Sequence, residues 1–200
     1  MKNRFISASI LSILALTFWH CNSPTAEYER MVRKALASGE RQDSLFLGVH
    51  LGMTSKDFYA HCWELNRQGI IKEGPANSSV QYYLPDTEQP IRMLFYPVFQ
   101  DDKIHEMSLE FNYVGWAPWN RQFYADKLQV ELLGILESWY GEGFIRLESA
   151  SSKELYVKID GNRRISLWQQ DEQVVKGLIT DLSVKKKAQP ENDKRSLSNR

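Results

Sequence analysis

The chain has 200 residues, of which 42% are hydrophobic and 25% are charged, and its 25 basic side chains balance its 25 acidic ones. This size and composition suit one compact domain or two small ones. When the two ends are set aside, residues 21–184 carry 17 basic and 23 acidic side chains. Such an acidic body argues against nucleic acid as the main partner, because phosphate binding needs clustered Lys and Arg.

Residues 1–20 have the pattern of a signal peptide. Lys2 and Arg4 precede about fifteen mostly apolar residues, a run too short to span a membrane comfortably and typical of a secretory signal. We therefore expect this segment to lie outside the folded core.

Cys21 follows directly, and the polar residues Asn-Ser-Pro come after it. An apolar run that ends in a cysteine resembles a bacterial lipoprotein signal, which implies that Cys21 becomes the lipidated first residue of the mature chain. His20 stands where that signal has a small residue, so a simply cleaved, secreted protein and an uncleaved anchor remain alternatives. The expected location is the cell envelope, lipid-anchored to the outer membrane, on its periplasmic or surface side. Without lipidation of Cys21, we expect secretion.

Between residues 21 and 44 the sequence predicts a spacer with one short helix. Tyr28, Val32 and Leu36 recur at helical spacing, and Gly39 is a plausible end. At the other end of the chain, residues 185–200 hold six basic side chains among polar residues. We interpret this segment as a disordered basic tail.

The body is expected over residues 45–184. Alternating Leu45, Leu47, Val49 and Leu51 predict a short strand. Thr54 and Asp57 then predict the capped start of a helix, with Phe58, Cys62 and Leu65 on its apolar face. After that helix, SVQYYLP near residues 79–85 predicts another strand.

Residues 91–113 predict an antiparallel hairpin with an acidic turn, QDDK. In its second run, we expect the odd positions from His105 to Tyr113 to face a core and the even ones, beginning with Ile104, to face water. Pro97 cannot donate a ladder hydrogen bond, so its strand should lie at a sheet edge there or carry a bulge.

The next stretch, FNYVGWAPW, is unusually aromatic for a connection. With Pro118 in its first turn, a helix is predicted over 118–139, and we expect it to be heavily buried along a broad apolar stripe. The stripe consists of Tyr124, Leu128, Leu132, Ile135 and Trp139, and it is widened by Val130, Leu133 and Leu136. Strands are predicted at 144–148, then as a hairpin around Asp160-Gly161-Asn162, and last at 174–184.

The fold class predicted is α+β, with antiparallel sheet covered by two amphipathic helices. The two helical segments share Phe-Tyr-Ala at an offset of 65 residues, at 58–60 and 123–125. This echo suggests a tandem repeat of a helix-then-sheet unit over 45–113 and 114–184, although convergence on a helix core explains it equally well.

The run LGMTSKDF, its helix, the strand SVQYYLP and the hairpin resemble the small lipoproteins of the outer-membrane barrel-assembly machinery. The tandem arrangement is also similar to modules of the beta-lactamase-inhibitor-protein kind. The resemblance covers residues 47–113, and it implies a binding scaffold of the envelope that does no catalysis.

No motif for catalysis, cofactor binding or metal binding stands out: there is no Gly-rich phosphate loop, no nucleophile elbow and no His pair at metal spacing. A carboxylate pair such as Asp101 or Glu106 with Glu142 leaves a small envelope-polymer hydrolase open as an alternative. A secreted protein inhibitor is another.

Aromatic residues near connections suggest a binding patch instead. The candidates are Tyr83, Tyr113, Trp116 and Trp119, since Trp and Tyr bury a large area and keep a polar tip; a place in the sheet core would explain them too. The function expected is that of a membrane-tethered, non-catalytic binding or assembly subunit, with a protein or other envelope component as partner and no cofactor.

Overall fold

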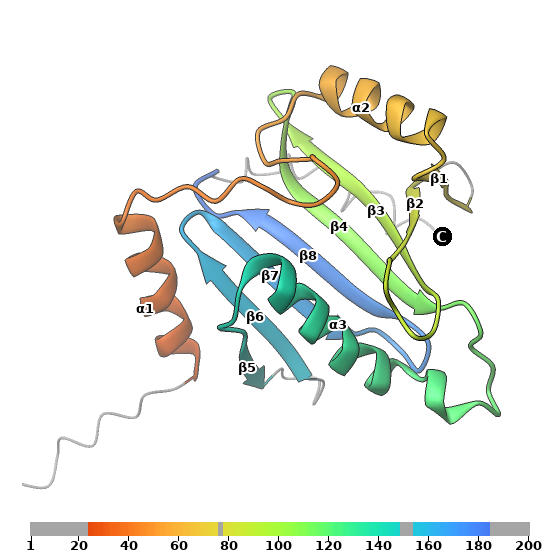
Figure 1. The fold of residues 1–200 in the computed structure, drawn as a ribbon. Coiled ribbons are helices and arrows are strands. Elements are labelled where there is room, and N and C mark those ends of the chain that lie inside the picture. The colour runs from red at the N-terminus through yellow and green to blue at the C-terminus, as the bar shows by residue number, and fades with distance from the viewer. Residues whose placement is uncertain (1–23, 76–77, 149–153, 185–200) are drawn as a thin grey trace, which may run out of the picture.

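A computed structural model describes residues 24–75, 78–148 and 154–184 of the chain. The predicted signal peptide, Cys21 and the predicted tail over 185–200 lie outside these residues. The described part contains three α-helices and one antiparallel sheet of eight strands, so the α+β class is confirmed (Figure 1).

The helices are α1 (Pro24–Ala37), α2 (Ser55–Arg67) and α3 (Ala125–Tyr140), and a short 3-10 turn, η2 (Arg121–Phe123), precedes α3. The strands are β1 (Lys72–Glu73), β2 (Val80–Tyr83), β3 (Ile91–Gln100), β4 (Lys103–Tyr113), β5 (Ile145–Glu148), β6 (Glu154–Asp160), β7 (Arg163–Gln169) and β8 (Val175–Asp181).

The order of strands across the sheet is β1-β2-β3-β4-β8-β7-β6-β5. Helices α2 and α3 thus each precede a run of four strands, and the two runs meet where β4 pairs with β8. The Phe-Tyr-Ala echo does not follow this order, because residues 58–60 lie within α2 whereas residues 123–125 lie at the junction of η2 and α3.

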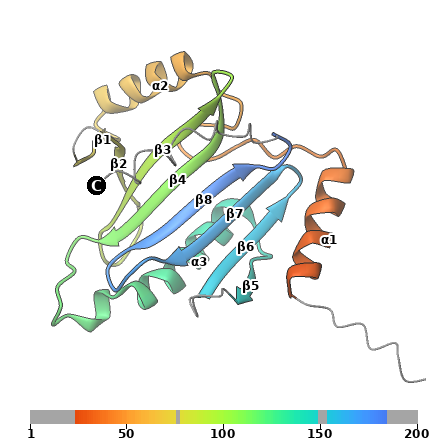
Figure 2. The same ribbon diagram turned by 180° about the vertical axis from the view of Figure 1, so that it is seen from behind.

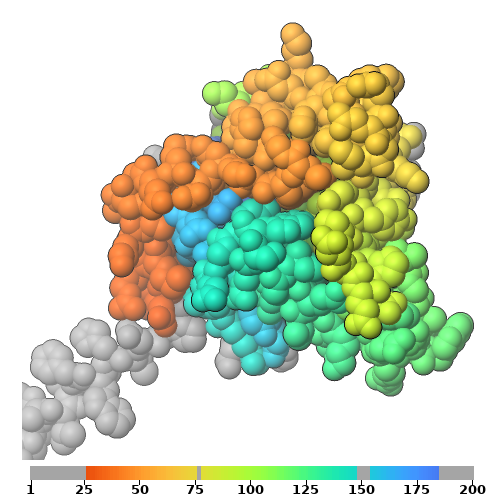
Figure 3. All heavy atoms as spheres, viewed as in Figure 1, coloured from red at the N-terminus to blue at the C-terminus, as the bar shows by residue number. Residues whose placement is uncertain are grey.

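One face of the sheet holds the core. Leu128, Leu132 and Leu136 of α3 are fully buried there, and α2 contributes Phe58 near the β3–β4 turn. Seen from this side, α3 and the chain before α2 form a nearly continuous layer over the strands (Figure 3). From behind, the central strands lie in front of α3, and no helix of the described residues covers them (Figure 2).

A bulge in the β3–β4 hairpin changes which residues of β4 face the core, so the predicted alternation of core-facing and water-facing residues does not hold throughout the strand. Val98 pairs with Glu106 and Phe99 pairs with Ile104, so one extra residue enters β4. Ile104, expected to face water, is consequently only 1% exposed and lies in the core. Pro97 lies beyond the last residue that β2 pairs, at an edge next to the bulge, as predicted.

The prediction of a strand over residues 45–51 is wrong. Leu47 and Gly48 have φ angles of 51° and 78°, and the chain folds back so that Leu45 donates its N–H to the carbonyl of Val49. Both side chains are still buried, because a turn can direct alternate apolar residues inward as a strand does. The alternating apolar pattern therefore reflects which side chains are buried and does not indicate an extended backbone.

The helix predicted over 118–139 begins seven residues later, at Ala125. Val130, expected to widen its apolar stripe, is 70% exposed. The capped start at Thr54 is confirmed, since Asp57 donates its N–H to the Thr54 hydroxyl over 3.1 Å.

Candidate functional site

The sheet face that no helix of the described residues covers is the candidate site, and we call it the open face. Its members follow from the register, which places Tyr96, Ser108, Leu178 and Ser166 in one row across β3, β4, β8 and β7. The next row holds Leu94, Glu110, Lys176 and Trp168. Both rows therefore combine apolar and polar side chains across the centre of the sheet.

A groove of about 530 Å³ runs over these two rows. Leu94, Tyr96, Leu178 and Trp168 supply apolar and aromatic surface along it, and the segment leading into β2 bounds it at Ser78 and Ser79. Tyr96 remains 39% exposed and Val98, on the same face, 43% exposed. The groove thus offers apolar surface of the kind that soluble proteins usually cover.

Two of the charged side chains in the groove form an ion pair. The Lys176 ammonium lies 2.5 Å from a carboxylate oxygen of Glu110, and both side chains are about 30% exposed. A half-exposed pair of this kind adds little stability but fixes the orientation of two polar groups. The groove therefore presents an apolar floor with one ordered ion pair and one further carboxylate, Glu106, which suits recognition of a partner.

Aromatic surface extends beyond the groove toward α2. The Tyr96 hydroxyl lies 2.8 Å from the Tyr59 hydroxyl, and the Tyr59 ring packs against Phe99. This hydrogen bond raises the pKa of Tyr59, with burial adding to the effect. The Tyr59 phenol therefore stays protonated at neutral pH, and the hydroxyl that accepts the bond between the two tyrosines can donate one to a ligand.

The structure does not bring the predicted patch together as one surface. Tyr113 is only 4% exposed, and its hydroxyl donates to Glu131 on the α3 side. Burial together with this bond raises its pKa. Tyr83 is 46% exposed and lies on the open face, since its row continues through Arg92 and Asn112.

The other two predicted residues lie in the connection between β4 and η2. Trp116 is half-buried and packs against Tyr124, whereas Trp119 is 86% exposed. Of the predicted set, Tyr83 alone lies on the open face. Sequence reasoning missed Tyr96, Leu178 and Trp168, which lie in two neighbouring rows that become apparent only once β4 is known to pair with β8.

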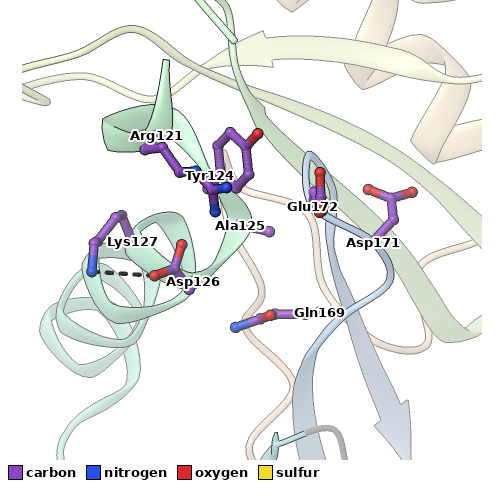
Figure 4. Close-up of a pocket in the computed structure, with 8 residues that line it drawn as sticks. All are labelled: Arg121, Tyr124, Ala125, Asp126, Lys127, Gln169, Asp171 and Glu172. Carbon is purple, nitrogen blue, oxygen red and sulfur yellow. Dashed lines mark ion pairs between the residues drawn. The ribbon is translucent and has the colours of Figure 1, made fainter. Parts of the chain in front are cut away.

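A second pocket, of about 650 Å³, lies at the start of α3 (Figure 4). Its charges are engaged in local contacts: Lys127 pairs with Asp126 at 3.2 Å, and the Arg121 guanidinium lies 5.2 Å from the centre of the Tyr124 ring. Asp171 accepts the N–H groups of Gln173 and Val174, as an ordinary turn residue does.

The carboxylate pair considered for hydrolysis is not assembled. Glu106 lies on the open face, whereas the chain at Glu142 lies on the α3 side, where its carbonyl accepts a bond from Lys158. Asp101 stands in the β3–β4 turn, and β8 and β7 separate β4 from β6. At about 4.8 Å per strand this amounts to about 14 Å, beyond the carboxylate separation of about 5–9.5 Å that glycosidases use.

Cys62 and the histidines have structural surroundings. Burial raises the pKa of the Cys62 thiol to about 11, which makes the thiolate scarce at neutral pH. His61 and His50 contact the carbonyls of Leu47 and Leu51. Within the described residues, no group of three or more His, Cys, Asp or Glu side chains is placed to hold a metal ion.

Over the same residues, no helix has the length and apolar character needed to cross a membrane. Comparisons with protein-family models, with curated proteins and with solved structures found no match. The resemblance to the barrel-assembly lipoproteins therefore stays a prediction.

Proposed function

We propose that the chain is a non-catalytic binding subunit of the cell envelope, lipid-anchored at Cys21, which holds a protein partner on its open face. The observation that carries this proposal is the groove over Leu94, Tyr96, Leu178 and Trp168. Tyr96 is exposed and the other three side chains are half-buried. Aromatic and aliphatic side chains that a rigid sheet holds partly exposed are favourable anchors for a protein interface, because little conformational entropy is lost when they become buried.

The engagement of the ionisable groups supports a binding role over a catalytic one. Lys176 is paired with Glu110, Asp171 caps a turn, and Lys158 and Arg163 both pair with Asp160. Side chains held in this way stabilise the fold, whereas a catalytic site needs reactive groups that converge on a substrate.

The order of elements supports a further part of the proposal, that residues 45–113 and 114–184 are two helix-then-sheet units. Their last strands, β4 and β8, pair at the centre of the sheet. The groove would then straddle the junction of the two units, drawing Tyr96 from the first and Leu178 and Trp168 from the second.

Site-specific photo-crosslinking tests the binding face. A photoreactive phenylalanine replaces Tyr96, and a matched variant carries it at Val130, which is 70% exposed on α3 on the opposite side of the sheet. In intact cells, we expect irradiation to join the Tyr96 variant to one discrete larger species and the Val130 variant to none. Equal crosslinking from both positions, or none from Tyr96, would contradict the proposal.

Metabolic labelling with a fatty-acid analogue tests the tether separately. The native chain should incorporate label and Cys21→Ala should not. Equal labelling of the two proteins would contradict lipidation at Cys21. The open face would then belong to a secreted binding protein, such as an inhibitor.

A further inference from the structure

We propose that the connection between β4 and η2, residues 114–120, rests on the lipid surface to which the chain is anchored, with Trp119 inserted among the headgroups. This inference rests on the proposed tether at Cys21. It assigns an orientation to the molecule and a role to the most exposed large hydrophobic side chain of the described residues.

Trp119 is 86% exposed, and Val114 in the same connection is 53% exposed. Neither side chain belongs to the core or to the groove on the open face. Tryptophan is favoured at the boundary between lipid and water, because its ring is apolar and its N–H remains hydrogen-bonded. A single exposed indole at the tip of a connection suits partial insertion into such a boundary.

The connection is held in shape by its own contacts. The Tyr124 hydroxyl donates to the carbonyl of Pro118 over 2.7 Å, and the N–H of Asn120 donates to the carbonyl of Ala117 over 2.9 Å. The Trp116 ring packs against Tyr124 at 6.2 Å between centroids. Trp119 is thus presented outward from an ordered base, so its insertion requires little rearrangement.

The anchor leads to the same end of the molecule. Only Asn22 and Ser23 separate Cys21 from the start of α1 at Pro24, so an extended chain spans about 10 Å between the lipidated residue and the helix. In both ribbon views, the first turn of α1 and the connection after β4 lie at the lower end (Figures 1 and 2). The two lie at opposite sides of this lower edge, so a flat membrane that runs along the edge can touch both.

Helix α1 is held against the sheet, so the position of its first turn also constrains the position of the rest of the molecule. Arg164 donates a hydrogen bond to the Tyr28 hydroxyl over 3.0 Å, and α1 lies beside β6. Because the helix does not hang free, the short tether limits how far the lower end can move from the lipid.

The charges near Trp119 indicate which lipid surface it fits. Arg121 lies over the Tyr124 ring and Lys127 pairs with Asp126, while Asp171 and Glu172 line the same pocket (Figure 4). Among these described residues there is no excess of positive charge to attract anionic lipid. Binding should thus depend on the indole and vary little with salt, and a zwitterionic phosphatidylcholine surface is sufficient.

Trp63 provides a matched control. It is 74% exposed, yet it lies on α2, which both views place at the upper end of the molecule (Figures 1 and 2). Replacing either Trp by Phe removes one exposed indole, and only the loss at Trp119 should affect contact with lipid.

The experiment measures quenching of tryptophan fluorescence by phosphatidylcholine with brominated acyl chains. The full protein, purified from its native membrane, is reconstituted into these vesicles and into unbrominated ones. We expect quenching in the native protein and in Trp63→Phe, and at least a two-fold smaller quenching in Trp119→Phe. Quenching that is absent from the native protein, or equal in the two variants, would overturn the proposal.

A second arm separates the proposed anchor from the proposed contact. In a Cys62→Ser background, Cys21 of the unlipidated protein is coupled through a maleimide to a phosphatidylcholine vesicle that carries a reactive headgroup. If the native protein fails to associate with vesicles, the lipid anchor is refuted, while quenching through Trp119 in the coupled protein still decides the membrane contact.

Discussion

At the residue scale, the turn between β6 and β7 shows how one glycine allows two distant segments to meet. Gly161 has a φ of 51°, and a Cβ added there would lie 2.4 Å from the carbonyl oxygen of Glu40. The segment at 40–43 packs against this turn, where Asn162 accepts the N–H of Gln42 and donates to Asp43. The absence of a side chain at position 161 is therefore a requirement of the packing.

We expect Gly161→Ala to destabilise the protein by about 2 kcal/mol or more, because strained backbone and a steric contact add together. Gly134 offers the matched control, since it lies inside α3 and a Cβ there meets nothing within 4 Å. Gly134→Ala should stabilise by about 0.5–1 kcal/mol through helix propensity. Urea unfolding of the three proteins measures both effects, and a neutral Gly161→Ala would show that the 40–43 segment does not pack as described.

Asp181 makes the free energy of unfolding depend on pH in the acidic range. Burial raises the pKa of this carboxyl, but hydrogen bonds from the Ser183 hydroxyl and N–H, from Asn162 and from Arg41 outweigh burial and hold the pKa below its ordinary value of 3.8. Because the folded pKa is the lower one, the stabilisation is present above pH 3.8 and is lost as the pH falls through the folded pKa.

Replacing Asp181 by Asn should accordingly flatten the decline in unfolding free energy below about pH 4, while lowering stability at pH 7. The measurement is the free energy of unfolding of both proteins at a series of pH values. If the two curves kept the same slope below pH 4, the carboxylate network around Asp181 would not be the source of the acid sensitivity.

At the element scale, the start of α2 depends on a local sequence signal. The Thr54 hydroxyl accepts the N–H of Asp57 and donates to its carboxylate over 2.7 Å. We expect Thr54→Ala to cost about 1 kcal/mol of unfolding free energy, since a backbone donor loses its partner, and Thr54→Ser to restore most of it. A loss of equal size in both variants would assign the effect to the methyl group instead of the cap.

Elements with such local signals could be predicted from the sequence. The caps of α2, the hairpin of β3 and β4, and the turn at Gly161 depend on neighbours within a few residues. The start of α3 could not, because Ala125 donates its N–H to the carbonyl of Glu172, a contact with a distant turn. The bulge at Ile104 is equally hidden, since it concerns how two strands register and not what either contains.

At the scale of the whole molecule, pairing of β4 with β8 creates the candidate site. Tyr96, Leu178 and Trp168 are dispersed in the sequence, and the register alone places them side by side. From the sequence we predicted that aromatic residues would carry binding and included Tyr113 among them, which the structure buries. Long-range strand pairing is the information that a single sequence lacks.

The whole-molecule account gives each surface a separate task. The open face is proposed to hold a protein, the lower end to rest on lipid, and α3 to support the sheet from behind. A partner on the open face would then approach from the side of the molecule, with its access unobstructed by the membrane.

The most direct measurement of the central claim compares partner recovery for two double variants. Tyr96→Ser with Trp168→Ala removes the anchors of the groove, and Trp63→Ala with Val130→Ser removes exposed apolar residues elsewhere. Each anchor contributes about 1–2 kcal/mol to a typical interface. The affinity for the species crosslinked at Tyr96 should therefore fall at least ten-fold in the first variant and stay unchanged in the second, with both proteins folded. Undiminished affinity in the first variant would contradict the assignment of the open face as the binding surface.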